Sequence, residues 1–216
     1  MNSIRAMLNV YFIAGTQDFH PTGGNLLHCL ESALQQGITC FQLREKGANA
    51  LQDAAATEAL ARECQALCRR YRVPFFINDD VALALKIGAD GVHVGQEDMP
   101  VEEVAARCGG KLVLGLSVNT LEQARHFAAI EGIDYFGVGP IFATRSKADA
   151  KAVVGPALLQ AIRAAGIDKP LVGIGGITTD NAAEVRQAGA DGVAVISAIT
   201  RAQDIAAAIQ QLGKQK

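Results

Sequence analysis

The chain alternates between short apolar runs and longer amphipathic segments. The apolar runs have the length of buried strands and lie at 8–14, 39–44, 74–78, 91–95, 112–116, 134–138, 171–174 and 192–196. The amphipathic segments predict helices near 24–36, 50–71, 80–88, 100–107, 120–130, 156–165, 180–188 and 203–212. The pattern therefore predicts a regular alternation of strand and helix along the whole chain.

A junction of one kind recurs between these helices and strands. A glycine ends each helix, an Asp makes the turn, and an apolar strand follows. The copies are Gly88-Ala89-Asp90-Gly91-Val92, Gly132-Ile133-Asp134-Tyr135-Phe136 and Gly189-Ala190-Asp191-Gly192-Val193, with Gly37-Ile38-Thr39-Cys40-Phe41 as a looser one. Repeated helix-to-strand junctions of this kind indicate parallel strands linked by crossover helices.

Eight such units in 216 residues predict an α/β protein with one domain over residues 1–216, a (β/α)8 barrel. An open, doubly wound sheet is the alternative. It is disfavoured because no Gly-x-Gly-x-x-Gly follows the first strand, and because polar residues follow nearly every strand. The active site of a (β/α)8 barrel lies at the carboxyl ends of its strands.

Composition narrows the function classes. The formal net charge of −2, with both signs interspersed, gives no electrostatic footprint for nucleic acid. No apolar run approaches the length of a membrane span, and residues 1–9 lack the features of a signal peptide. The five cysteines show no paired spacing, so we interpret them as apolar residues in a reducing compartment. A cytoplasmic location is expected, and the oligomeric state is left open, a homo-oligomer included.

The last two strands predict a phosphate-binding cup. Gly175-Gly176 follows the run Leu171–Ile174, and Ser197-Ala198-Ile199 follows 192–196 as a single helical turn. Backbone N–H groups exposed in such loops bind anions. In a (β/α)8 barrel, the loops after strands seven and eight are where a phosphate site is expected. The alternative is that the glycines only permit tight turns.

Residues at other strand ends could carry chemistry. Gln42 and Arg44 alternate with apolar neighbours and are expected to point toward the barrel mouth, where a buried Arg needs an anion; a surface pair of Arg44 with Glu45 is the alternative. Asp79 and Asp98 follow neighbouring strands and could hold one Mg²⁺, with Asp80 as a helix cap.

Ser117, a neutral hydrogen-bonding group, follows strand five, and Thr120 is expected to cap the next helix. His93, within a strand, is interpreted as a satisfied core residue.

Two loops at strand ends are long, at 15–24 and 139–155. The second contains the basic residues Arg145, Lys147 and Lys151 and is expected to close over an anionic ligand. Thr144 and Ser146 can donate hydrogen bonds to phosphate there.

In combination, six stretches resemble the thiamin phosphate synthase family. They are Gln42-Leu43-Arg44-Glu45-Lys46, Asn78-Asp79-Asp80, Val94-Gly95-Gln96-Glu97-Asp98, Gly139-Pro140-Ile141-Phe142-x-Thr144-x-x-Lys147, Gly173-Ile174-Gly175-Gly176-Ile177 and Ala190-Asp191-Gly192-Val193-Ala194-Val195-Ile196-Ser197. The resemblance implies a (β/α)8 barrel that joins hydroxymethylpyrimidine diphosphate to phosphorylated hydroxyethylthiazole. It also implies a dissociative reaction in which diphosphate leaves first, with Mg²⁺ as cofactor.

The resemblance also implies a role for each matching position. Asp79 and Asp98 would hold Mg²⁺, while Arg44, Lys46, Asn78 and Lys147 would bind the diphosphate. Gln42 and Ser117 would lie near the pyrimidine, and Thr144, Ser146, Gly176, Ile196 and Ser197 would surround the thiazole phosphate. Among these, Arg44, Lys46, Lys147 and Ser117 are expected to be catalytic.

Three alternatives are weaker. A thiazole tautomerase of the same barrel family would need the phosphate cup but would leave Asn78, Asp79, Asp98 and Lys147 unexplained. A non-catalytic ligand sensor would not require the metal and diphosphate residues. A generic phosphate-binding isomerase would explain the cup but not the acidic pair.

Overall fold

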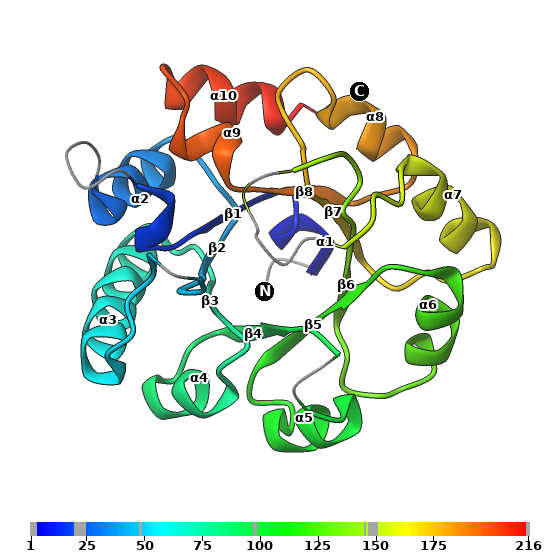
Figure 1. The fold of residues 1–216 in the computed structure, drawn as a ribbon, viewed down its shortest axis with the longest axis horizontal. Coiled ribbons are helices and arrows are strands. Elements are labelled where there is room, and N and C mark those ends of the chain that lie inside the picture. The colour runs from blue at the N-terminus through cyan, green and yellow to red at the C-terminus, as the bar shows by residue number, and fades with distance from the viewer. Residues whose placement is uncertain are drawn as a thin grey trace.

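A closed barrel of parallel strands forms the centre of the molecule. The computed structural model describes residues 4–19, 25–47, 49–96, 99–144, 146 and 151–214. Within them, eight strands pair in chain order, and β8 returns to β1 (Figure 1). The strands are β1 (Val10–Ala14), β2 (Cys40–Leu43), β3 (Phe75–Asn78), β4 (Gly91–Val94), β5 (Val113–Val118), β6 (Tyr135–Val138), β7 (Leu171–Ile174) and β8 (Gly192–Val195). The predicted (β/α)8 barrel is confirmed.

Helices surround this barrel, most of them between one strand and the next, and one helix lies across its amino end (Figure 1). They are α1 (Ile4–Met7), α2 (Leu26–Gln35), α3 (Ala54–Tyr71), α4 (Val81–Ile87), α5 (Val101–Cys108), α6 (Leu121–Ala128), α7 (Pro156–Ala164), α8 (Ala182–Gln187), α9 (Ser197–Thr200) and α10 (Ile205–Leu212), with a 3₁₀ turn η1 (Thr16–Asp18). The predicted caps Asp80 and Thr120 are confirmed, because their side chains accept from the backbone N–H groups of Leu83 and Gln123.

Alternation along the strands separates two apolar regions. Phe41, Phe75 and Phe136 face outward and pack in the large core between the strands and the helices. Tyr11 and Phe76 face inward and fill the barrel interior. The interior is therefore a packed layer and not a pore, as is general for this fold.

Helix α1 closes the amino end of the barrel. It lies across the middle of the strand ring in Figure 1, and its Met7 packs with the interior cluster together with Leu8. The hydrophobic pattern does not predict α1, because four residues are too few to show a helical period. The first strand begins at Val10 and not at residue 8, because the backbone N–H groups of Leu8 and Asn9 donate to carbonyl oxygens of α1.

The recurring Asp residues complete the amino ends of the strands. Asp90 Oδ2 accepts from Phe75 N at 2.8 Å, Asp134 Oδ2 from Leu114 N at 2.7 Å, and Asp191 Oδ2 from Leu171 N at 2.8 Å. The looser copy does the same with Thr39, whose Oγ1 accepts from Val10 N at 2.8 Å. Each junction thus satisfies a backbone donor of the preceding strand, which a buried strand end requires.

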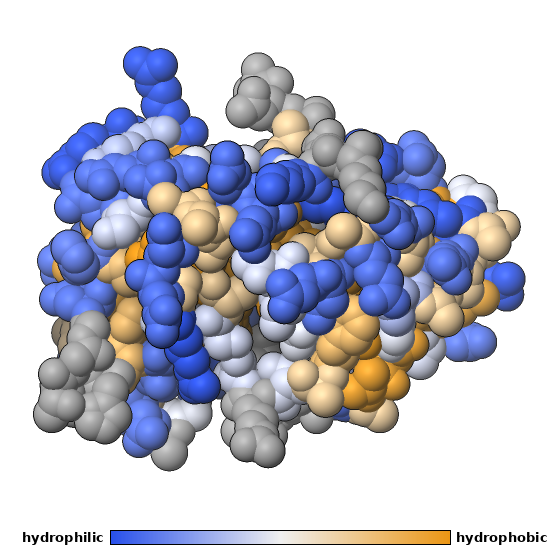
Figure 2. Space-filling view, turned by 90° about the horizontal axis from the view of Figure 1, so that it is seen from above, coloured by the Kyte–Doolittle hydropathy of each residue, from blue (hydrophilic) through white to orange (hydrophobic). Residues whose placement is uncertain are grey.

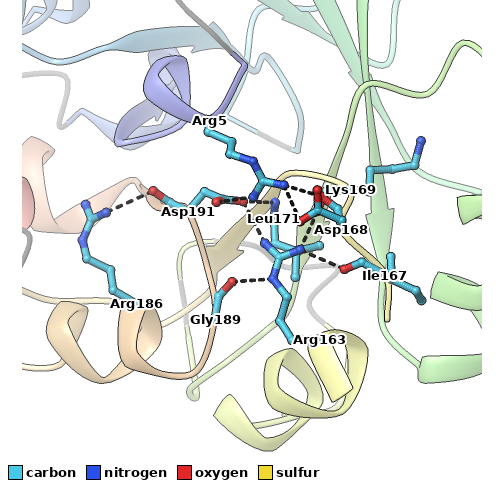
Figure 3. Close-up of polar contacts among 9 residues, drawn as sticks. All are labelled: Arg5, Arg163, Ile167, Asp168, Lys169, Leu171, Arg186, Gly189 and Asp191. Carbon is cyan, nitrogen blue, oxygen red and sulfur yellow. Dashed lines mark hydrogen bonds and ion pairs between the residues drawn. The ribbon is translucent and has the colours of Figure 1, made fainter. Parts of the chain in front are cut away.

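Asp191 also holds together segments that are distant in sequence (Figure 3). Its carboxylate contacts Arg163 Nη2 of α7 at 2.8 Å and Arg5 Nη1 of α1 at 2.5 Å. Arg163 donates further to the carbonyl oxygens of Ile167, Lys169 and Gly189. This cluster ties α1, α7 and the amino ends of β7 and β8 to one another.

The outer surface is polar over most of the face seen in Figure 2, where apolar residues occur in small groups. In the described part of the chain, the exposed large hydrophobic residues are Leu85 and Val153. None of the helices described is long and apolar enough to cross a membrane.

Candidate active site

A cavity of about 360 Å³ opens at the carboxyl ends of the strands. Its lining comes from the ends of β2 to β7 and the loops that follow them. The lining residues are Arg44, Lys46, Asn78, Asp79, His93, Gly95, Gln96, Ser117, Asn119, Gly137, Gly139, Pro140, Thr144, Lys151, Ile174 and Gly175. The cavity therefore collects residues predicted from five separate strand ends.

Arg44 reaches the cavity from the residue after β2 and is only 5% exposed. Its neighbour Glu45 is held by the loop after β1, accepting from Thr16 N at 2.6 Å and from Thr16 Oγ1 at 2.7 Å. Glu45 also accepts from Leu51 N at 2.8 Å. The carboxylate thus fixes two loops beside the cavity. A guanidinium at the edge of a cavity suits an anionic ligand, because Arg forms charge-assisted hydrogen bonds with carboxylate and phosphate oxygens.

Asp79 follows β3 in a left-handed conformation, with φ of 60°. This conformation is uncommon outside glycine, although Asp tolerates it better than most residues. Its Oδ2 accepts from Lys46 Nζ at 2.9 Å and from Asn78 Nδ2 at 2.7 Å. Asp80, one residue on, turns away and caps α4. The backbone at Asp79 therefore aims one carboxylate into the cavity and the next into the helix.

The residues around Asp79 fit a magnesium site whose coordination is completed by oxygen atoms of the substrate. Among the described residues, no group of three His, Cys, Asp or Glu side chains could form a closed metal cage. Mg²⁺ commonly takes one or two carboxylates together with waters and phosphate oxygens. The Asp79 side chain is 29% exposed and lines the cavity, and its carboxylate forms an ion pair with the ammonium group of Lys46. The other predicted ligand, Asp98, lies outside the described residues, as does Lys147.

A chain of polar side chains runs beneath the cavity, inside the barrel. Gln42 Nε2 donates to Tyr11 Oη at 2.6 Å, and Tyr11 Oη lies 3.1 Å from Tyr135 Oη. His93 joins Tyr135 Oη through Nδ1 at 3.0 Å and Ser117 Oγ through Nε2 at 2.9 Å. Burial raises the pKa of both tyrosines well above its usual value, so both remain neutral donors at physiological pH.

The polar side chains beneath the cavity give Gln42 and His93 contacts that the sequence pattern did not predict. Gln42 points into the barrel as expected, but it is not one of the residues lining the cavity and is 1% exposed, because its amide ends at Tyr11 one layer deeper. His93 has partners on both ring nitrogens, as a satisfied core residue should, and it also lines the cavity. His93 faces inward on β4 because it lies two residues after the inward-facing Gly91, and this register could have indicated that His93 reaches the cavity.

A smaller cavity of about 30 Å³ lies at the ends of β7 and β8. Thr144, Ser146, Gly176, Ile196 and Ser197 are among the residues that line it. Thr144 and Gly175 line both cavities, so the two are contiguous. The structure thus brings together the five residues predicted for the phosphate cup, at the edge of the larger cavity.

Glycine is required in the loop of the small cavity. Gly175 and Gly176 have φ of 97° and 65°, and a Cβ on Gly176 would lie 2.5 Å from the carbonyl oxygen of Ala143. Asn181 supports the loop, donating to Gly176 O at 3.0 Å and accepting from Thr178 N at 2.8 Å. Asn181 immediately precedes α8, but its side chain holds this loop and does not cap the helix. The predicted helical turn after β8 is α9.

The cavity is also lined by Gln96, Asn119 and Pro140, to which the sequence pattern assigned no role. Gln96 Nε2 donates to Ser117 O at 2.7 Å, and Asn119 Nδ2 donates to Gly139 O. Their amides fix the backbone of neighbouring strand ends. Lys151 lines the cavity from the basic loop after β6, while Arg145 of that loop lies outside the described residues.

Comparison with known proteins identifies the family. Residues 10–199 match the family described as thiamine monophosphate synthase, which is most of the chain. The chain belongs to the thiamine monophosphate synthase family. Two curated relatives are each called thiamine-phosphate synthase: one from Listeria innocua is 59% identical over 97% of both chains, and one from Pasteurella multocida is 57% identical over 98% of both.

A solved structure agrees with this family membership. The thiamine phosphate pyrophosphorylase from Pyrococcus furiosus is 34% identical, with a TM-score of 0.81 over 97% of this chain and 96% of that one. The prediction of a thiamin phosphate synthase family enzyme is therefore confirmed. Neither the tautomerase nor the ligand-sensor alternative finds support among these relatives. The roles of the individual site residues stay predictions.

Proposed function

We propose that this thiamin phosphate synthase family enzyme joins hydroxymethylpyrimidine diphosphate to phosphorylated hydroxyethylthiazole, releasing diphosphate. The observation that carries the proposal is the pair of contiguous cavities at the strand ends. The larger one contains Arg44, Lys46, Asn78 and Asp79, a set suited to a diphosphate and a cation. The smaller one is lined by a glycine loop and by hydroxyl groups, which suit a single phosphate. Two phosphorylated substrates would thus be held side by side.

In the reaction that fits this cavity, the carbon–oxygen bond to diphosphate breaks first, and the electron pair leaves with the diphosphate. The pyrimidine stabilises the methylene cation that remains, and the thiazole nitrogen then forms the new carbon–nitrogen bond. Arg44, Lys46 and Lys147 neutralise the departing charge. Fixed charges of this kind contribute most when they are preorganised before reaction. No strong protein base is required.

Asp79, together with Asp98, would hold the Mg²⁺ of the proposed reaction. Bound there, the ion supplies further positive charge to the diphosphate oxygens. Asn78 donates to Asp79 Oδ2 and so keeps that carboxylate in place. Lys46, whose Nζ contacts the same oxygen at 2.9 Å, would bind the diphosphate.

We also propose a cytoplasmic location. All five cysteines are free and buried, and burial raises the pKa of Cys29 to about 11 and that of Cys68 to about 12. Buried thiols without disulfides fit a reducing compartment. The expected ligands are small phosphorylated molecules.

Two adjacent carboxylates give a matched test of the metal assignment. Asp79→Asn removes the cavity carboxylate and is expected to abolish Mg²⁺-dependent formation of thiamin phosphate while the protein stays folded. Asp80→Asn changes only the charge of the α4 cap, and Asn caps helices about as well as Asp, so stability and turnover should both change little. Thiamin phosphate is quantified over a Mg²⁺ titration, with circular dichroism as the folding control. Wild-type Mg²⁺ dependence in Asp79→Asn would remove Asp79 from the metal site.

A further inference from the structure

The polar chain inside the barrel has a defined direction. It starts at Gln42 Nε2, which can only donate, so Tyr11 Oη accepts at that bond. The single hydroxyl hydrogen of Tyr11 is then available for Tyr135 at 3.1 Å. The Cys40 sulfur also lies near Tyr11, but sulfur is a weak acceptor beside a phenol oxygen. Tyr11 therefore donates to Tyr135.

Tyr135 and His93 continue the polar chain to the cavity. Tyr135 Oη accepts from Tyr11, so its own hydrogen goes to His93 Nδ1 at 3.0 Å. A neutral imidazole that accepts at Nδ1 carries its proton on Nε2, which donates to Ser117 Oγ at 2.9 Å. Ser117 Oγ thus accepts from His93, and its hydrogen is left to point into the cavity that Ser117 lines.

The barrel makes room for this chain with glycines on three adjacent strands. A Cβ on Gly115 of β5 would lie 2.2 Å from Tyr135 Cζ and 2.5 Å from His93 Nδ1. A Cβ on Gly137 of β6 would lie 2.8 Å from His93 Cε1, and one on Gly91 of β4 would lie 2.2 Å from Phe76 Cε1. The rings of Tyr11, Phe76 and Tyr135 then pack edge to face, with centroids 5.9 to 6.2 Å apart. Packing of this kind fixes the ring orientations.

We propose that Tyr135, supported by Tyr11 and Gln42, is a positioning residue that holds His93 in its Nε2–H tautomer, so that Ser117 presents a hydrogen-bond donor to the bound substrate. The identity of that substrate, a phosphorylated pyrimidine, rests on the proposed function; the direction of the chain does not. Ser117 then donates to an acceptor atom of the substrate, such as a ring nitrogen or a diphosphate oxygen. Tyr135 itself does not line the cavity and acts only through His93 and Ser117.

The tautomer can be measured without substrate. The protein has four histidines, so ¹⁵N-histidine labelling gives a simple spectrum, and loss of one signal set in His93→Gln assigns His93. The proposal predicts a proton on Nε2 and none on Nδ1 in the wild type. In Tyr135→Phe the Nδ1 acceptor loses its donor, and the two tautomers should both be populated. A wild-type His93 with its proton on Nδ1 overturns the proposal, whatever the enzyme catalyses.

Kinetics separate positioning from general stabilisation. The protein has three tyrosines, and Tyr71 serves as the matched control. Its hydroxyl group forms hydrogen bonds with Glu31 and Gln35 at the surface. Tyr135→Phe is expected to lower kcat/KM for thiamin phosphate formation about tenfold, the worth of one hydrogen bond. Tyr71→Phe should leave it unchanged. In a Ser117→Ala background, Tyr135→Phe should cause no further loss, because both changes remove the same donor.

Two kinetic results would contradict the proposal. One is wild-type kcat/KM in Tyr135→Phe. The other is a Tyr135→Phe effect of equal size with and without Ser117, since a purely structural role would act independently of that hydroxyl group. A wild-type enzyme that forms no thiamin phosphate would instead overturn the proposed function, and the tautomer measurement would still decide the direction of the chain.

Discussion

Neighbouring residues at the strand ends of this barrel face different partners. Arg44 lines the cavity while Glu45 fixes two loops, and Asp79 lines the cavity while Asp80 caps a helix. The cap role of Asp80 could be predicted from local pattern alone, because capping involves residues three positions apart. The partner of Gln42 could not, because Tyr11 is 31 residues away and pairs with it only when the barrel closes.

At the same scale, the recurring Asp residues should differ in their contribution to stability. Asp191→Ala removes the partner of Arg163, whose side chain is 23% exposed, as well as the acceptor for Leu171 N. We expect a loss of about 3 kcal/mol in the free energy of unfolding, as for a largely buried pair broken on one side. The contact with the more exposed Arg5 adds little. Urea unfolding measures the loss.

Asp90→Ala is the matched control for that comparison. Asp90 Oδ2 accepts from Phe75 N in the same junction. Its removal should cost about 1 kcal/mol, the worth of a hydrogen bond. Neither variant should change kcat, because both positions lie at the amino end of the barrel. Equal losses in the two variants would show that the arginine contacts of Asp191 contribute nothing.

Most strands and helices could be predicted because each apolar run is bounded by a glycine turn or a cap. The predicted boundaries are wrong where the polarity of a residue does not indicate its secondary structure. Because Ser117 is polar, the pattern predicts that the fifth strand ends at residue 116. Ser117 instead lies inside β5, which continues to Val118, and it pairs with Gly137 of β6. The predicted helix over 50–71 begins at Ala54, because the side chain of Asp53 accepts from Ala56 N. Polar residues that face a barrel interior resemble loop residues in a linear pattern.

The glycine loop after β7 gives a prediction about an element. Gly176→Ala would force the loop away from Ala143, since its Cβ would lie 2.5 Å from that carbonyl oxygen. We expect the KM for the thiazole phosphate to rise about tenfold or more, because at least one hydrogen bond to phosphate is lost. The KM for the pyrimidine substrate should change less. Steady-state kinetics with each substrate varied in turn measure both values.

Gly166→Ala provides the control for backbone strain. Gly166 also has positive φ, at 78°, but a Cβ there would meet nothing within 4 Å. The substitution should cost about 1 kcal/mol of stability and leave both KM values unchanged. If Gly166→Ala raised the thiazole phosphate KM as much as Gly176→Ala does, the loop after β7 would not be the phosphate site.

The two ends of the whole barrel have separate tasks. The amino end contains α1, the recurring Asp residues and the arginine cluster, all of which bind other parts of the chain. The carboxyl end contains the two contiguous cavities. This division is general for the fold, so the repeated junction was sufficient to predict it. The interior polar chain could not be predicted, because Tyr11 and Tyr135 come from β1 and β6 and meet only across the closed barrel.

An end-point assay tests whether the protein catalyses the proposed Mg²⁺-dependent reaction. Purified protein is incubated with hydroxymethylpyrimidine diphosphate and hydroxyethylthiazole phosphate, with Mg²⁺ or with excess chelator, and thiamin phosphate and released diphosphate are both quantified. Equal amounts of the two products are expected with Mg²⁺, and neither product is expected with chelator. Absence of thiamin phosphate with Mg²⁺ present, or equal product with chelator, would contradict it.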